Sequence, residues 1–266
     1  MNNFKYAVAY NPNILHARDA KANLCSILSG YNVQVDVLDI DNLKSGYDFV
    51  FVIGGDGTIL KSARFYAKFQ TPVFGVNLGR LGFLSQSSVE DIRSAVQKIL
   101  EGKYIVEDRL MLSGGRYSAL NDFVVKSSVS GRTSRFSLKI NEKTVCDYLA
   151  DGIIVATPTG STAYGLSAGG PVLVPGLQAF VIVPICPHTL TARPLVVPDF
   201  EKISICVNGE SSYFLYADGQ EFSEFNNEIH IQKSQYTAKL ALLESGGFYS
   251  VLNDKLHWGT SPANIS

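Results

Sequence analysis

The sequence has few cysteines, no excess charge of either sign and no apolar run long enough to cross a membrane. Cys25, Cys146, Cys186 and Cys206 form no CxxC pair, which argues against zinc motifs and a disulfide framework and predicts reduced, mostly buried thiols. The 23 basic residues nearly balance the 24 acidic ones, so no basic field attracts nucleic acid or an anionic membrane. Apolar stretches such as 179–183 are broken by proline well short of a membrane span. We therefore expect a soluble, cytoplasmic protein with no nucleic-acid or membrane partner.

Apolar residues are abundant, and their spacing indicates the fold class. The chain has 266 residues, 46% of them hydrophobic, enough for one large domain or two modest ones. Up to residue 100, helical stretches alternate with short β-branched or aromatic runs at 6–10, 32–38, 49–53 and 72–76. This alternation predicts an α/β domain with a mostly parallel sheet.

The clearest helical pattern covers residues 89–100. Ser88 is placed to cap its start and Gly102 follows its end, so we expect this helix to close a first domain at 1–100.

Beyond Gly102 the apolar residues alternate with period two, which predicts a β-rich, β-sandwich-like second domain over 101–247. Segments with this pattern include 136–140, 202–207 and 228–233. The tail 248–266 regains a weak helical pattern, and we expect it to pack back on the first domain.

The strongest local feature is an apolar strand at 50–53 that leads into the turn Gly54-Gly55-Asp56-Gly57-Thr58 and a helical pattern. Glycines let a ligand approach the backbone, and the N–H groups at a helix N-terminus suit phosphate oxygens. The turn is neither a GxGxxG fingerprint nor a Walker A loop, since no lysine follows the last glycine. It predicts a phosphate-binding turn of another kind of kinase.

Asp56 is unusual in such a turn, because a carboxylate repels phosphate unless a cation or a hydroxyl lies between them. One interpretation is that Asp56 orients and deprotonates an attacking hydroxyl, or holds Mg²⁺ through water. The other is that it only caps the following helix. The local sequence leaves both open.

A second feature covers residues 151–171, where a strand ending at Pro158 is followed by many hydroxyls, small residues and glycines. These offer neutral hydrogen-bonding groups beside exposed backbone, which suits a nucleoside better than a charged group. The alternative is a β-turn and a capped short helix that packs closely through alanine and glycine. The length and density of the segment favour a binding site.

Four segments resemble the ordered motifs of the NAD kinase family: 54–58, 77–84, 119–122 and 151–171, with a closing motif at 252–259. The first motif also occurs in diacylglycerol, sphingosine and phosphofructokinase relatives, whereas the long fourth motif is highly specific. The resemblance implies a two-domain NAD kinase-like fold of the bacterial ATP-NAD kinase type. It also implies transfer of a phosphoryl group from ATP or another donor to the 2′-hydroxyl of the adenosine ribose of NAD, giving NADP.

The resemblance assigns roles to individual residues. Asp56 activates or orients the 2′-hydroxyl, Phe83 packs near the adenine, and the phosphates are approached by Gly54, Gly55, Gly57 and Thr58. Asn121 contacts the adenosine and Asp122 binds ribose hydroxyls. Asp122 stands where the family usually has glutamate, and Asn121-Asp122 can also be read as a simple turn before a strand.

The remaining assignments fall in the second half of the chain. By resemblance, Asp151 accepts hydrogen bonds from the nicotinamide side of NAD, and the nucleoside pocket is lined by Thr159, Thr162, Ala163, Tyr164 and Ser167. Asp218 matches a family position near the active site, although Asp218-Gly219-Gln220 reads first as a hairpin turn.

The expected ligands are NAD, ATP or another phosphate donor, and Mg²⁺ carried with that donor instead of a metal held by the protein. The family forms homodimers or homotetramers. Two alternatives remain: a non-catalytic pyridine-nucleotide sensor, supported only by the shortened Asp122, and a lipid kinase sharing the glycine turn. A lipid kinase should have Asn-Glu directly after the turn, where this chain has residues 59–62, Ile-Leu-Lys-Ser.

Overall fold

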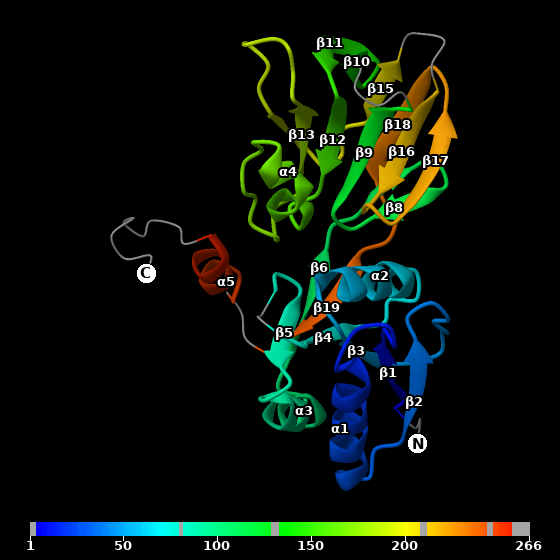
Figure 1. The fold of residues 1–266 in the computed structure, drawn as a ribbon, viewed down its shortest axis with the longest axis vertical. Helices are drawn as coiled ribbons and strands as arrows, with labels where there is room; N and C mark the ends of the chain where they lie inside the picture. The colour runs from blue at the N-terminus through cyan, green and yellow to red at the C-terminus, as the bar shows by residue number, and fades with distance from the viewer. Residues whose placement is uncertain (1–3, 80–81, 129–132, 208–211, 244–246, 257–266) are drawn as a thin grey trace. The chain divides into compact units, whose positions relative to one another are not determined.

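The structure, a computed structural model, describes residues 4–79, 82–128, 133–207, 212–243 and 247–256. It divides into two compact units, the first made of residues 1–108 with 238–266 and the second of residues 109–237. Figure 1 shows the elements of both units. Each unit has its own sheets and its own core.

The first unit is built on a seven-stranded sheet with the order β2-β1-β3-β4-β19-β6, in which β5 also pairs with β4. The pairs β1–β2, β1–β3, β3–β4, β4–β5 and β4–β19 are all parallel. The mostly parallel sheet expected from the sequence is confirmed. Its strands are β1 (Tyr6–Tyr10), β2 (Val35–Asp39), β3 (Phe49–Ile53), β4 (Val73–Asn77), β5 (Ser85–Ser88), β6 (Ile105–Arg109) and β19 (Ala238–Leu242).

Helices cover both faces of this sheet. The helices α1 (Ala17–Gly30) and α3 (Ile92–Leu100) share one core with strand residues such as Phe49 and Phe51. The helix α2 (Asp56–Ala67) contacts β3, β4 and β19 and lies on the other face in Figure 1. Because β3 is covered from both sides, all five of its residues are buried.

The start of α3 differs from the expectation. Ser88 does not cap a helix at residue 89, because it is the last residue of β5 and pairs with Asn77 of β4. Its hydroxyl accepts the backbone N–H of Asp91 and donates to the Asp91 carboxylate, and the helix begins at Ile92. Strand pairing therefore keeps the preceding residues out of the helix.

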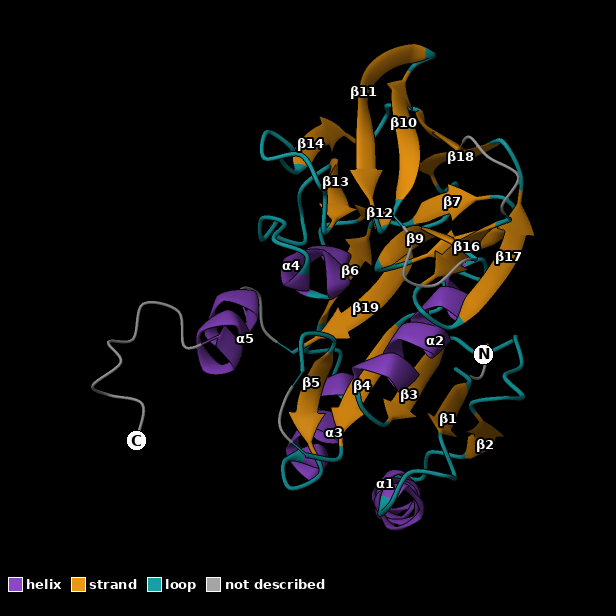
Figure 2. Cartoon of the chain, turned by 45° about the horizontal axis from the view of Figure 1, so that its top comes forward, coloured by secondary structure: helices purple, strands orange, loops and turns teal. Residues whose placement is uncertain are grey.

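The second unit is a sandwich of two six-stranded antiparallel sheets, with orders β11-β10-β15-β18-β7-β8 and β14-β13-β12-β9-β16-β17. Inward-facing residues of both sheets, such as Phe123, Phe136, Ile153 and Ile205, form one core. The β-rich architecture expected from period-two patterning is confirmed, and strands dominate this unit in Figure 2. Its elements are β7 (Leu112–Gly114), β8 (Tyr117–Ala119), β9 (Asp122–Ser127), β10 (Ser134–Ile140), β11 (Lys143–Ala150), β12 (Gly152–Ala156), η1 (Gly160–Thr162), α4 (Tyr164–Ser167), β13 (Ala179–Ile185), β14 (Leu195–Pro198), β15 (Ile203–Val207), β16 (Tyr213–Ala217), β17 (Glu221–Phe225) and β18 (Glu228–Lys233).

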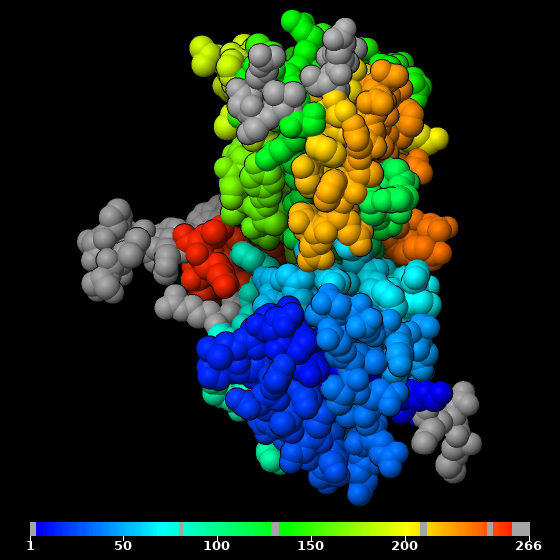
Figure 3. Space-filling view, turned by 45° about the vertical axis from the view of Figure 1, so that its right-hand side comes forward, coloured from blue at the N-terminus to red at the C-terminus, as the bar shows by residue number. Residues whose placement is uncertain are grey.

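The outer face of the second sheet is apolar as well. Around β12 and β13 it is covered by the segment after α4, and Leu173 of that segment shares one apolar cluster with Val124 and Ile154. Toward β16 and β17 it carries an aromatic patch made of Phe214, Tyr216 and Phe222, whose rings are in mutual contact. Phe222 is 58% exposed, and its edge strand β17, in orange, lies at the surface in Figure 3.

The helix α5 (Gly247–Leu256) belongs to the first unit, where the ring of Phe248 lies 6.1 Å from that of Phe83. The rest of the closing 252–259 motif, from His257, is outside the described residues. No helix in the described ranges combines the length and the apolar character that a membrane span needs.

All four cysteines are free, but the expectation that most are buried is wrong. Cys186 is exposed and the other three are half-buried. Cys206 illustrates the reason: it alternates with Ile205 and Val207, which face the core, so its thiol lies on the outer side of β15.

Candidate active site

The glycine turn follows β3 directly and leads into α2. A Cβ on Gly54 would lie 2.6 Å from the hydroxyl oxygen of Thr58, so only glycine lets the turn close on itself. A Cβ on Gly55 or on Gly57 would meet nothing within 4 Å. The backbone of these two residues therefore borders open space beside the N-terminus of α2, where phosphate oxygens are favoured.

Asp56 does not cap α2. The N-cap residue is Gly55, with no side-chain cap, and the Asp56 carboxylate turns instead to a segment of the 77–84 motif. Its two oxygens accept the backbone N–H groups of Phe83 at 2.9 Å and Leu84 at 3.3 Å. A carboxylate has about four acceptor positions, so these two bonds leave capacity for a substrate hydroxyl or a metal-bound water.

The close contact between Asp56 and Gly82 shows how tightly this segment is packed. A Cβ on Gly82 would lie only 2.0 Å from Asp56 Oδ1. Two other members of the 77–84 motif, Arg80 and Leu81, lie outside the described residues. The turn residues and Phe83, both expected at the site, thus come together within the first unit.

In the second unit, strand pairing brings the 119–122 and 151–171 motifs together. The strands β9 and β12 pair so that Asp122 lies opposite Ala156. Thr157 donates its N–H to Asn121 O at 2.9 Å and its hydroxyl to Leu120 O at 2.6 Å. A Cβ on Gly160 would lie 2.0 Å from Asn121 O, so the glycine is required by the approach of these two backbones.

Asp218 holds the backbone of the 120–122 segment. It lies in the turn between β16 and β17, where Asp218 and Gly219 both have positive φ, 52° and 64°. Its carboxylate accepts the N–H groups of Leu120 at 3.0 Å, Asn121 at 2.8 Å and Asp122 at 3.1 Å. The hairpin interpretation is correct, and the same residue positions the Asn121-Asp122 pair.

Asp122 has an unusual protonation equilibrium. Its side chain is buried, with 4% of the residue exposed. Burial, and after it the nearby charge of Asp218, raise the pKa of Asp122 to about 7. Near neutral pH this carboxyl group therefore exists in both forms, and the protonated form can donate a hydrogen bond as well as accept one.

These residues border a pocket of about 440 Å³, a volume in the range of small-molecule sites. Five of its lining residues were expected at the site: Asn121, Asp122, Ala163, Tyr164 and Asp218. Four were not: Val124, Lys126, Tyr216 and Gly219. Side chains alternate between the two faces of a strand, so Val124 and Lys126 lie on the same face of β9 as Asp122. The sequence could therefore have predicted these two residues. Tyr216 lies opposite Val124 on β16, which local patterning does not reveal.

Four other expected residues of the second unit do not line this pocket. Asp151 is exposed just before β12, at the end away from Ala156 and Asp122. Thr159 is buried, and its hydroxyl accepts a hydrogen bond from Arg109 Nη1 at 3.4 Å. The Thr162 hydroxyl donates to Thr159 O at 3.2 Å, and Ser167 is exposed on α4.

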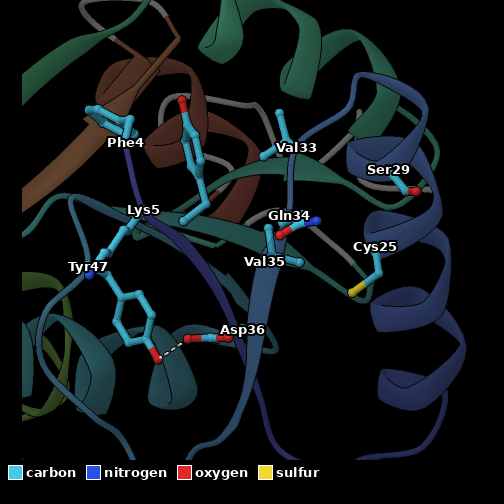
Figure 4. Close-up of a pocket in the computed structure, with 10 residues that line it drawn as sticks. Phe4, Lys5, Cys25, Ser29, Val33, Gln34, Val35, Asp36 and Tyr47 are labelled. Carbon is cyan, nitrogen blue, oxygen red and sulfur yellow. Dashed lines mark hydrogen bonds between the residues drawn. The ribbon is translucent and has the colours of Figure 1, made fainter. Parts of the chain in front are cut away.

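A second pocket, of about 580 Å³, lies in the first unit (Figure 4). Tyr6 and Val35 line it, and they are the paired first residues of β1 and β2. On its wall Tyr47 Oη donates a hydrogen bond to Asp36 at 2.9 Å. The pocket thus lies at the amino ends of the parallel strands, whereas the glycine turn follows the carboxyl end of β3. It is therefore separate from the candidate active site.

The first unit has a phosphate-binding glycine turn that carries a carboxylate, and the second has a pocket with many hydrogen-bonding groups. These are features of a nucleotide-binding phosphotransferase. The ATP-NAD kinase N-terminal domain family matches residues 13–104, and the ATP-NAD kinase C-terminal domain family matches residues 120–243. The chain belongs to the NAD kinase family.

Individual relatives agree. The NAD kinase of Carboxydothermus hydrogenoformans is 43% identical over 242 residues, covering 86% of each chain. The NAD kinase of Thermoanaerobacter sp. is 40% identical over 227 residues, covering 81% of this chain and 80% of the relative. A crystal structure of an NAD kinase from Archaeoglobus fulgidus in complex with ATP has a TM-score of 0.81 and 31% identity, covering 95% of this chain and 98% of that one.

At the level of fold, the yeast NADH kinase complexed with NADH superposes with a TM-score of 0.85 at 24% identity, covering 98% of this chain and 90% of that one. The two-domain NAD kinase fold and the kinase activity expected from the sequence are confirmed. Neither the lipid kinase nor the non-catalytic sensor gains support from these comparisons.

Proposed function

We propose that the chain transfers a phosphoryl group from ATP, or another phosphate donor, to the 2′-hydroxyl of the adenosine ribose of NAD, with Asp56 orienting and deprotonating that hydroxyl. The observation that carries this proposal is the Asp56 carboxylate, which is held beside the glycine turn by the N–H groups of Phe83 and Leu84. In-line phosphoryl transfer depends mainly on positioning and on charge neutralisation. A fixed carboxylate at a phosphate-binding turn provides the positioning.

The nucleoside part of NAD occupies the pocket of the second unit. Asn121 and Asp122 offer an amide and a carboxyl group there, and Tyr164 and Tyr216 offer aromatic surface. The donor phosphates lie on the backbone of residues 54–58. The contacts of Phe83, Asp151, Thr159, Thr162 and Ser167 with NAD rest on the family resemblance and complete the proposed site.

Mg²⁺ accompanies the phosphate donor. Hard oxygen ligands suit this ion, and the donor phosphates would supply them. When bound, the ion neutralises the charge on the transferred phosphoryl group.

The enzyme works as a homodimer or homotetramer in the cytoplasm. The aromatic patch of Phe214, Tyr216 and Phe222 supports association, since it is half-buried at Phe214 and Tyr216 and exposed at Phe222, and apolar patches at the surface mark contact surfaces. The four free cysteines fit a reducing compartment. Light scattering on the purified protein should give the mass of two or four chains, and the mass of one chain would contradict the assembly.

The experiment that tests the reaction is an assay of NADP formation from NAD, ATP and Mg²⁺, run on the protein, on Asp56→Asn and on the control Asp19→Asn. Asp19 is an exposed carboxylate in the first turn of α1. We expect Asp56→Asn to lose about 100-fold or more in kcat, the size of a general-base contribution, while NAD affinity changes little. Asp19→Asn should behave like the unaltered protein. Binding of NAD without NADP formation from any donor would support the sensor instead.

A further inference from the structure

Lys126 is the one basic side chain among the nine described residues that line the pocket of the second unit. It lies on β9 and contacts Tyr164, which starts α4. Its ammonium group donates a hydrogen bond to Tyr164 Oη at 3.1 Å and lies 5.0 Å from the centre of the ring. One cation thus contacts both the hydroxyl and the ring of an expected NAD-binding residue.

The neighbouring strands make room for this contact. Lys126 pairs with Gly152 of β12 on one side and with Phe214 of β16 on the other. A Cβ on Gly152 would lie 2.9 Å from Lys126 Cγ. Because position 152 has no side chain, the aliphatic stem of Lys126 can lie against β12, the strand that α4 contacts.

Tyr164 lies at the surface, at the start of a short helix. It is 38% exposed, and it begins a helix of only four residues that has no side-chain cap. An exposed aromatic side chain on so short a helix has rotational freedom, which costs binding free energy when a ligand must fix it. A contact that already holds the ring lowers that cost.

The two carboxylates of the pocket have other surroundings. Asp218 accepts three backbone N–H groups, and Asp122 is buried. The Lys126 ammonium group instead contacts Tyr164, through both its hydroxyl and its ring.

We propose that Lys126 is a positioning residue of the NAD pocket, which holds the ring of Tyr164 in the orientation that lines the pocket. This inference rests on the proposed function, in which the pocket receives the nucleoside part of NAD. Lys126 acts through Tyr164 and takes no part in the phosphoryl transfer.

The first test compares Lys126→Met, Lys126→Arg and the control Lys143→Met in steady-state kinetics. Methionine keeps the apolar stem and removes the charge and the donor, and Lys143 is an exposed lysine on the edge strand β11 of the same unit. We expect Lys126→Met to raise KM for NAD about threefold to tenfold, the size of one hydrogen bond with a cation–π contact, while kcat stays within about twofold. Arginine should restore most of the affinity, and Lys143→Met should change nothing.

The second test asks whether Lys126 acts through the tyrosine. Tyr164→Phe keeps the ring and removes the hydroxyl that Lys126 contacts. Because the two residues form one unit, the double variant Lys126→Met/Tyr164→Phe should raise KM for NAD by a factor well below the product of the factors for the two single variants. The effect of Lys126→Met should also be the same at low and high salt, because the contact with Tyr164 is not an ion pair.

Three results would overturn the inference: an unchanged KM in Lys126→Met, fully multiplicative effects in the double variant, or a loss of affinity that disappears at high salt. The last two would mean that the ammonium group contacts the ligand itself. The variant Asn121→Ala distinguishes a wrong role for Lys126 from a wrong assignment of the NAD pocket. If Asn121→Ala also leaves KM for NAD unchanged, the pocket is not the NAD site and both proposals fall.

Discussion

The Asp56 carboxylate accepts the backbone N–H of Phe83 at 2.9 Å, a contact that joins residues 27 positions apart in the chain. It connects the glycine turn after β3 with the segment that precedes β5. The group proposed to orient the substrate hydroxyl is therefore also the group that holds this segment. A change on either side of the contact should affect both positions.

Gly82→Ala should disturb this contact without removing any functional group. The new Cβ would lie 2.0 Å from Asp56 Oδ1, so the carboxylate or the segment must move. We expect kcat to fall at least about tenfold and the free energy of unfolding to fall by about 1–3 kcal/mol, as for other overpacked sites. The matched control is Gly79→Ala, where a Cβ would meet nothing within 4 Å. Equal activity of the two variants would show that the contact does not position Asp56 for catalysis.

Asp218→Asn should loosen the Asn121-Asp122 segment. Asparagine tolerates the positive φ of this turn, but its NH₂ group cannot accept the backbone N–H groups that both carboxylate oxygens now accept. We expect a loss of about 1–3 kcal/mol in the free energy of unfolding, measured with urea, and a higher KM for NAD. Asp147→Asn, which changes an exposed carboxylate on β11, should do neither. A stable Asp218→Asn protein with unchanged KM would contradict the positioning role.

The protonation of Asp122 should make stability depend on pH. Burial raises its pKa from 3.8 to about 7, so the folded protein binds an extra proton between about pH 4 and pH 7. This contribution is fully present below pH 4 and is lost as the pH rises through 7. Asn imitates the neutral form, so the stability of Asp122→Asn relative to the unaltered protein should rise by roughly 2–4 kcal/mol between pH 4 and 8. A difference that stays constant across this range would mean that Asp122 titrates normally.

Removal of divalent cations should abolish turnover and leave the fold intact. The described residues contain no group of three or more His, Cys, Asp or Glu side chains able to hold a metal ion, so stability should not depend on one. Excess EDTA should stop NADP formation, and added Mg²⁺ should restore it, while the melting temperature stays within about 1 °C. A large drop in melting temperature with EDTA would reveal a structural metal instead.

The local sequence determined those elements whose burial and backbone conformation depend only on a few neighbouring residues. The apolar run of β3 and the glycines after it specify a buried strand and an open turn by themselves, because burial and backbone freedom are properties of those residues. The limits of β1, β3 and β18 agree with the period of their apolar residues. The four motifs follow one another in the same order as in the NAD kinase family, and this was enough to indicate the family.

Pairing between distant segments was decided only by the tertiary structure. The strand β19 joins the first sheet after the whole second unit has intervened, and Asp218 reaches residues 120–122 from 96 to 98 positions away. The helix-cap interpretation of Asp56, which the local sequence left open, was decided in the same way, because the N–H groups that its carboxylate accepts lie 27 and 28 residues further on. A window of sequence shows which face of a strand is buried, but the register between strands sets which side chains meet, and that register depends on packing throughout the unit.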